Sequence, residues 1–161
     1  MPIAAANCAC LFVFVLGISA YWDRTIVWLH VLEAVPYAVA AALCATRRTF
    51  GYALGAASGA FWLWVAGTQT SFVRNGFERV SMLLRTGAVD RWDVLIAAPA
   101  ALATGGLVVC SLLAYARGRK APIRDATLFA STGVLVVVYF TAVFAAAGPQ
   151  YLPLVRRAFG F

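Results

Sequence analysis

The sequence predicts an all-α fold, a polytopic bundle of five transmembrane helices with a short interfacial amphipathic helix between the third and the fourth. Of the 161 residues, 63% are hydrophobic and 12% are charged, whereas soluble domains carry roughly 25% charged residues. Five apolar stretches are each long enough to cross a bilayer, which takes about 20 helical residues. We expect residues 1–161 to form a single transmembrane domain, because no length remains for a separate soluble one.

The first predicted span covers residues 2–22. Pro2 suits the first position of a helix, where its missing N–H would have no helical partner in any case. Residues 17–20 loosely resemble a signal-peptide cleavage site, but no Lys or Arg precedes the apolar run. We therefore expect a retained membrane span.

The second span, residues 26–46, holds the only histidine of the chain, His30, and the only carboxylate inside an apolar run, Glu33. Its length of about 31 Å matches the hydrocarbon thickness of a bilayer. A separation of three residues places both side chains on one face of the helix. Because ionisable groups are costly at this depth, the pair is a candidate functional site. Pro36 leaves the carbonyl of Leu32 without its helical partner and predicts a kink.

The third span, residues 50–72, contains three glycines that are spaced four residues apart. In lipid, such a ridge lets another helix approach closely. The fourth span, residues 91–116, has a small-residue ridge of its own, which we expect to be a suitable mate for the first. The two predicted ridges are Gly51, Gly55 and Gly59, and Ala97, Ala101 and Gly105.

Residues 73–87 break the apolar pattern. Their apolar residues recur at spacings of three and four, with polar residues mostly opposite, which predicts a short helix lying in the membrane interface. The apolar face consists of Val73, Phe77, Val80 and Leu84. The fifth span covers residues 122–147 and ends before Gly148 and Pro149.

Five crossings place the two termini on opposite sides of the membrane. Basic residues divide almost equally between the two sides and do not orient the chain. The thiols gather toward the N-terminal side and the indoles toward the other: Cys8, Cys10, Cys44 and Cys110, against Trp22, Trp28, Trp62, Trp64 and Trp92. Thiols on a reducing side favour a cytoplasmic N-terminus, and we expect a bacterial inner membrane with the C-terminus outside.

The net charge of +7 does not indicate nucleic-acid binding, because the basic residues lie in short loops beside apolar spans. We expect them to contact lipid headgroups. The bilayer and other membrane subunits are therefore the expected partners.

His30 and Glu33 permit four interpretations. The first is structural: Glu33 pairs with His30, or with Arg24 or Arg91, and fixes the register of helices or subunits. The second is a proton relay or cation site. The third makes His30 the single axial ligand of a haem or chlorophyll-type pigment. The fourth is contact with a quinone headgroup near the outer interface.

The chain has no phosphate-binding loop, no zincin motif, no nucleophile elbow and no paired carboxylates inside its spans. The cysteines lack a C-x-x-C spacing, and we expect them to pack as small apolar residues without a metal. We therefore expect a non-catalytic accessory subunit of a larger membrane complex. The alternatives are a small transporter or channel that uses His30 and Glu33 in a homo-oligomer, and a haem-, pigment- or quinone-binding subunit.

Overall fold

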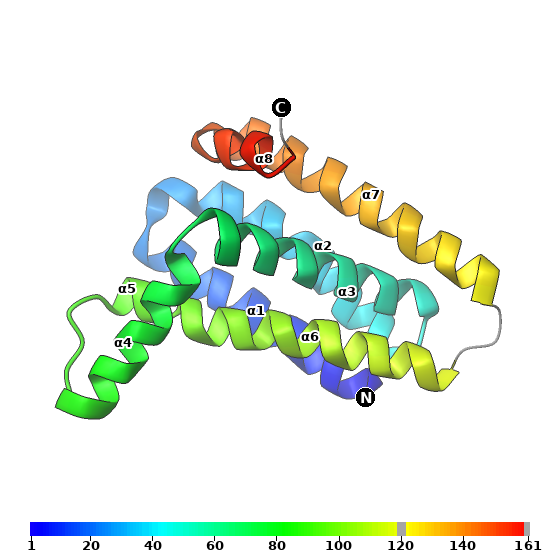
Figure 1. Ribbon diagram of the computed structural model, residues 1–161, viewed down its shortest axis with the longest axis horizontal. Coiled ribbons are helices and arrows are strands. Elements are labelled where there is room, and N and C mark those ends of the chain that lie inside the picture. The colour runs from blue at the N-terminus through cyan, green and yellow to red at the C-terminus, as the bar shows by residue number, and fades with distance from the viewer. Residues whose placement is uncertain (119–121, 160–161) are drawn as a thin grey trace.

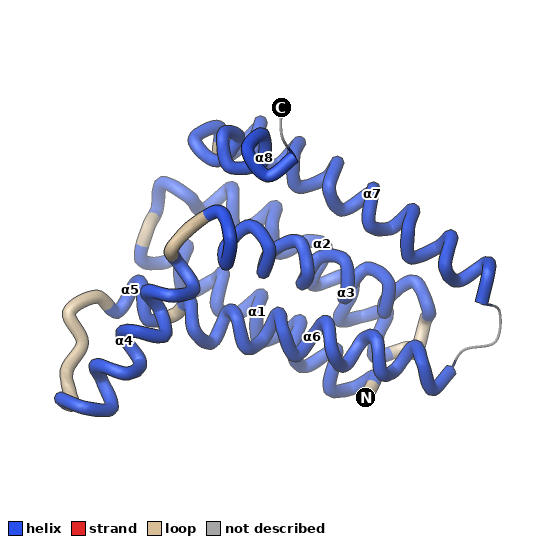
Figure 2. The backbone as a smooth tube through the Cα atoms, in the orientation of Figure 1, coloured by secondary structure: helices blue, strands red, loops and turns tan. Residues whose placement is uncertain are grey.

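The computed structural model describes residues 1–118 and 122–159, and all regular elements in those ranges are helices (Figure 1, Figure 2). Their order is α1 (Pro2–Trp22), the 3-10 turn η1 (Arg24–Ile26), α2 (Val27–Ala45), α3 (Thr49–Trp64), the π-helical segment η2 (Val65–Gln69), α4 (Phe72–Thr86), α5 (Trp92–Leu95), α6 (Ala97–Gly118), α7 (Pro122–Ala147), the 3-10 turn η3 (Pro149–Tyr151) and α8 (Leu152–Phe159).

Four helical stretches are long and apolar enough to cross a membrane, which is the property of an integral membrane protein. They are Pro2–Trp22, Arg24–Ala45, Trp92–Gly118 and Ile123–Ala147. The bounds of α1 and α7 are those expected from the sequence. The third predicted span does not appear as a single α-helix of that length.

The helices α1, α2, α3 and α6 pack side by side, and α7 lies against α2 and α3. Figure 1 shows α4 leaving this bundle at one end and crossing the start of α6. We call this the α4 end; there α1 passes into α2, and α7 passes into α8. The fully buried core includes the aromatic rings of Tyr37, Phe12 and Phe140.

The third predicted span, residues 50–72, changes its helical form at Val65 and ends at Gln69. Two hydroxyls bond to carbonyls four residues earlier: Thr68 to Trp64 at 2.5 Å and Thr70 to Ala66 at 2.7 Å. Such side-chain bonds compete with the helical ladder and bend it. Single-turn π segments of this kind are frequent at functional sites.

The fourth predicted span, residues 91–116, is divided at Ile96 into α5 and α6. Pro99 explains the break, because it has no N–H to donate to the carbonyl of Leu95. Pro99 is the third residue of α6, where helical N–H groups have no intrahelical partner. A new helix therefore begins at Ala97 without the loss of another backbone hydrogen bond.

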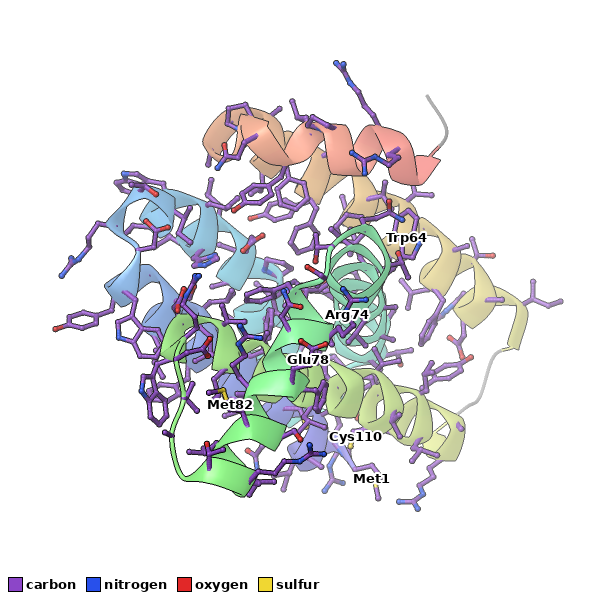
Figure 3. The ribbon with its side chains drawn as sticks, turned by 60° about the vertical axis from the view of Figure 1, so that its left-hand side comes forward. Met1, Trp64, Arg74, Glu78, Met82 and Cys110 are labelled. Atoms are coloured by element: carbon purple, nitrogen blue, oxygen red, sulfur yellow. The ribbon has the colours of Figure 1, made fainter. Side chains whose placement is uncertain are left out.

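The helix α4 ends at Gly87, whose φ of 71° is in the left-handed region that glycine favours. A Cβ at Gly76 would lie 2.7 Å from the Cβ of Ala97, so α4 contacts α6 at glycine. The expected apolar face points largely outward, with Leu84 81% and Phe77 43% exposed, and Val73 and Val80 half-buried. Figure 3 shows another side of α4, with Arg74, Glu78 and Met82.

Candidate functional site

The link between α1 and α2 sets the register of the candidate site. Asp23 has extended backbone angles (φ −116°, ψ 99°) and ends α1. Its carboxylate accepts hydrogen bonds from the Thr25 amide (2.9 Å) and the Thr25 hydroxyl (2.6 Å), which lower the pKa of Asp23. So short a link makes α1 and α2 antiparallel neighbours, and Ser19 on α1 faces His30 on α2.

Ser19, His30 and Glu33 form a hydrogen-bonded row across this helix pair. The Nε2 atom of His30 lies 2.9 Å from the Ser19 hydroxyl, and its Nδ1 atom lies 2.8 Å from a Glu33 carboxylate oxygen. When Glu33 is ionised, its carboxylate only accepts, so Nδ1 of His30 donates to it, and a neutral ring then accepts the Ser19 proton at Nε2. A hydroxyl, a base and an orienting carboxylate in this order are the arrangement that activates a nucleophile.

Because the row is buried, the loss of any one partner would leave a polar group without a hydrogen bond away from water, at a high cost in free energy. The Glu33 residue is 6% exposed, and the His30 side chain is 14% exposed. Of the partners expected for Glu33, the structure brings His30 alone to it. Arg24 lies over the Tyr21 ring, 5.4 Å from its centre, and Arg91 bonds to Asp93.

A cavity of about 330 Å³ lies beside the row. This volume is at the lower end of the range of about 300–1,000 Å³ for small-molecule pockets. Most of the lining is apolar, while Ser19, His30 and Glu33 contribute polar groups from α1 and α2. The cavity reaches the α4 end of the bundle, where Asp23 and Asp93 also line it.

Six aromatic residues of the lining belong to one ring cluster that is joined through Tyr37: Phe12, Phe61, Trp62, Phe140, Phe144 and Tyr151. The stacked pair is Phe61 and Phe140, with ring centres 4.9 Å apart, and Phe12 meets Trp62 edge-on at 5.1 Å. Such pairs contribute about 0.5–1.5 kcal/mol beyond the area they bury. The cluster gives the cavity a rigid aromatic wall that can contact a ring or an acyl chain.

The segment around Pro36 connects the site to α7 and α3. Because Pro36 has no N–H, the carbonyl of Leu32 needs another donor, and the Tyr139 hydroxyl on α7 supplies it at 2.7 Å. The hydroxyl of Tyr37, next in the chain, donates to the carbonyl of Ser58 on α3 at 2.9 Å. The two tyrosines thus hold three helices around the cavity.

Tyr151, in η3, lines the cavity from the C-terminal segment. Burial, and to a lesser degree the nearby charge of Glu33, raises the pKa of its hydroxyl. The phenol therefore stays protonated and keeps its O–H as a hydrogen-bond donor. A side chain at Gly148 would lie 2.9 Å from the Tyr151 ring, so glycine there allows η3 to fold back onto α2.

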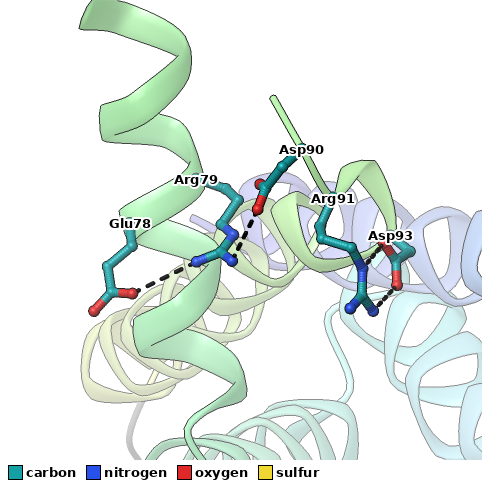
Figure 4. A network of polar contacts seen from close by, with 5 residues as sticks. All are labelled: Glu78, Arg79, Asp90, Arg91 and Asp93. Carbon is teal, nitrogen blue, oxygen red and sulfur yellow. Dashed lines mark hydrogen bonds and ion pairs between the residues drawn. The ribbon is translucent and has the colours of Figure 1, made fainter. Parts of the chain in front are cut away.

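Ion pairs join α4 to the loop before α5 and fix the start of α5 (Figure 4). Arg79 on α4 bonds to Asp90 at 3.2 Å and lies 3.7 Å from Glu78. Arg91 makes two hydrogen bonds to Asp93, at 2.9 and 2.6 Å, in the bidentate geometry that fixes both side chains. Asp93 itself lines the cavity.

The glycine ridge of α3 lies against two helices. A Cβ at Gly51 would lie 2.6 Å from the Cβ of Leu43 on α2. On the α6 side, a Cβ at Gly55 or Gly59 would lie 2.9 Å from atoms of Leu107, Ser111 or Val108. Two residues of the expected mate do not face the ridge: a Cβ at Gly105 would meet nothing within 4 Å, and Ala97 faces Gly76 on α4.

Sequence reasoning missed Ser19, which it considered only as part of a cleavage-site pattern. A small polar residue in an apolar helix is a weak signal, and only the antiparallel register of α1 and α2 brings it to His30. Within residues 1–118 and 122–159, no three His, Cys, Asp or Glu side chains gather as a metal-ligand set.

Comparison with protein-family models, with curated proteins and with solved structures finds no match for the chain.

Proposed function

We propose that this integral membrane protein binds a carbonyl-headed amphiphile, with the head at Ser19 and His30 and the apolar tail in the adjoining cavity. The observation that carries the proposal is the buried His30–Glu33 pair on the wall of a mostly apolar cavity. Pockets that bind small molecules combine apolar walls with a few placed polar groups in this way.

The ligand chemistry follows from the groups that line the cavity. The Tyr151 hydroxyl is a donor in the lining, whereas Ser19 already donates its proton to His30, and a carbonyl oxygen is the matching acceptor for Tyr151. The three carboxylates of the lining are already bonded, Glu33 to His30, Asp23 to Thr25 and Asp93 to Arg91, and a neutral head leaves these bonds intact. Quinones and ester lipids share the required chemistry: a carbonyl head and an apolar tail.

The quinone alternative is favoured over the haem and pigment alternatives by the state of His30. Both ring nitrogens are engaged, one with Ser19 and one with Glu33. Axial ligation of a metal would have to displace one of these hydrogen bonds. A carbonyl ligand needs no such exchange.

The topology is part of the proposal. We propose that α3 and η2 together form a fifth crossing, since Thr49–Trp64 and Val65–Gln69 continue one another over about 31 Å. We also propose that α4 lies in the interface with Phe77 and Leu84 toward lipid, and that the N-terminus faces the cytoplasm of a bacterial inner membrane.

A second candidate function is that of an accessory subunit in a larger membrane complex. It is favoured by glycines that have open space where a side chain would lie, because helices in lipid pack closely at such glycines. At Gly17 on α1, Gly105 on α6 and Gly133 on α7, an added Cβ would have nothing within 4 Å. A partner helix could fill these sites, and co-purification with other subunits after mild extraction would support this role.

The test of ligand binding is photoaffinity labelling in nanodiscs with a long-chain methyl ketone that carries a diazirine in its tail. A ketone presents the carbonyl but has no leaving group. We expect labelling of peptides that contain Phe12 or Trp62. The variant Ala66→Leu, which adds volume to the lining, should reduce this labelling several-fold.

The matched control is Ala60→Leu, the same change on the exposed side of α3. It should leave the labelling unchanged. Labelling that spreads over lipid-facing helices and ignores Ala66→Leu would refute a specific pocket. Competition by decyl-quinone or by a methyl ester of the same chain length then separates the two ligand sources.

A further inference from the structure

We infer that Ser19 is a nucleophile that cleaves carboxylic esters with long acyl chains, with His30 as its base and Glu33 as the group that orients His30. The inference rests on the proposed ligand pocket and adds a reaction to it. The geometry that carries it is the continuous row from the Ser19 hydroxyl through His30 to the Glu33 carboxylate, at 2.9 and 2.8 Å. The sequence pattern indicates the pair of His30 and Glu33 but not Ser19, because the hydroxyl comes from another helix.

Each member has the chemistry that its position requires. The carboxylate of Glu33 holds Nδ1–H and so presents the Nε2 lone pair to Ser19. It also stabilises the imidazolium that forms when His30 takes the proton. The apolar surroundings strengthen both effects, because charges interact more strongly away from water.

The depth of the row fits an ester of a membrane lipid. Ser19 is three residues before Trp22, the last residue of α1, which places it about 4.5 Å from the helix end. Lipid ester groups lie at this boundary between the hydrocarbon core and the headgroups. The acyl chain then extends into the cavity past Phe12 and Trp62, while water enters from the α4 end, where the exposed residues Asp23 and Asp93 line the cavity.

The reaction balances with water as the co-reactant. The Ser19 oxygen bonds to the ester carbonyl carbon while its proton moves to Nε2 of His30. The carbon–oxygen bond to the alcohol then breaks, and the alcohol leaves with that proton, which gives an acyl ester of Ser19. Water attacks this ester and gives its proton to Nε2. The fatty acid leaves, and the proton returns to the Ser19 oxygen.

Among the residues that line the cavity, Tyr151 has an O–H donor and Trp62 has an N–H donor, and we assign both to the carbonyl oxygen of this reaction. Both come from elements other than the pair that carries the row. A purely structural Ser19–His30 bond would need neither donor. Tyr151→Phe should therefore slow ester cleavage and leave folding intact.

The experiment is labelling of the full chain in nanodiscs with a long-chain fluorophosphonate, followed by peptide mapping. We expect one adduct, on Ser19, and release of 4-nitrophenol from 4-nitrophenyl laurate. Ser19→Ala should abolish both signals. His30→Asn should slow both by roughly 100-fold or more, the contribution of a general base.

The control is Ser131→Ala on α7, which removes an exposed hydroxyl that bonds only within its own helix. It should leave both signals unchanged. A protein that takes up the ketone photoprobe but shows no adduct at Ser19 overturns the catalytic inference and leaves ligand binding standing. Failure of the photoprobe itself overturns ligand binding. An adduct at Ser19 with the same rate in His30→Asn also overturns the inference, because the base would then have no role.

Discussion

The hydroxyl of Tyr139 donates a hydrogen bond to the carbonyl of Leu32 across 2.7 Å. These residues lie on α7 and α2, 107 positions apart in the chain. The carbonyl lacks its usual partner because Pro36 has no N–H. A backbone carbonyl without a partner is costly at membrane depth, so the proline and the distant tyrosine form one unit.

Replacing Tyr139 by Phe should destabilise the protein by about 1–3 kcal/mol, the cost of leaving a buried acceptor unsatisfied. In a Pro36→Ala background the loss should be smaller, because the introduced alanine supplies the N–H that Leu32 needs. Denaturant titration in detergent measures both values and the coupling between them. Tyr21→Phe, at a 70% exposed position, is the control. Equal losses in the two backgrounds would contradict the assignment.

The helices were predictable because the length of an apolar stretch and its helix-breaking residues can both be read within one segment of the sequence. Pro36 indicated a freed carbonyl, and the interfacial helix predicted over residues 73–87 ends where α4 meets Gly87. The identity of the donor, Tyr139, was not predictable, because nothing in periodicity relates α7 to α2. The same limit hid Ser19. The pair of His30 and Glu33 can be recognised from the sequence of one helix, because the two residues are three positions apart. The third member, Ser19, can be recognised only from the way that two helices pack.

The glycine ridge shows a related limit. The pattern predicted a partner ridge of Ala97, Ala101 and Gly105, and the α6 atoms nearest to Gly55 and Gly59 belong to Thr104, Leu107, Val108 and Ser111. Rotation of α6 about its own axis decides which face meets the ridge, and no local pattern encodes that rotation. Pro99 adds to the difference, since it divides the predicted fourth span at Ile96.

Gly59→Ala should destabilise the protein by about 1–3 kcal/mol through overpacking. A Cβ there would lie 2.9 Å from a Val108 methyl and 3.0 Å from the Thr104 carbonyl oxygen, and neither can move away freely. Gly105→Ala, where nothing lies within 4 Å, should be neutral or slightly stabilising. Thermal midpoints of the two variants in detergent provide the comparison. A protein that tolerates Gly59→Ala as well as Gly105→Ala would show that α3 and α6 do not pack this closely.

The stability of the protein should depend more on the hydrogen-bond acceptor that the Glu33 side chain provides than on its negative charge. Glu33→Gln keeps an oxygen for the His30 Nδ1–H and should lose about 1 kcal/mol or less. Glu33→Leu leaves that buried donor unpaired and should lose about 2–3 kcal/mol. In the double variant with His30→Leu the loss should shrink, because an apolar pair replaces the polar one. Unfolding titrations of the four proteins test this, and an unchanged Glu33→Leu protein would mean that the pair carries no structural energy.

Asp23 should make the link between α1 and α2 acid-sensitive. Its carboxyl has a pKa below the ordinary 3.8, chiefly because the Thr25 hydroxyl and then the Thr25 amide donate to the charged form. The folded state therefore binds fewer protons than the unfolded state, and stability rises with pH in this window. The contribution of Asp23 to stability is fully present above the ordinary pKa of an aspartate, and it is lost as the pH falls through the lowered pKa of the folded state. The Asp23→Asn variant keeps a capping side chain that does not titrate.

The thermal midpoint of the wild type should therefore fall toward that of Asp23→Asn as the pH is lowered from about 6 to about 3, the range in which an aspartate titrates. Thr25→Val removes the hydroxyl donor and should shrink the pH-dependent difference, because the carboxylate then keeps the amide alone. A difference that stays constant over this range would show that the hydrogen bonds to Thr25 are not formed by the charged carboxyl in the folded protein. One that grows on acidification would reverse the sign of the pKa shift and remove Asp23 as the cap that sets the Ser19–His30 register.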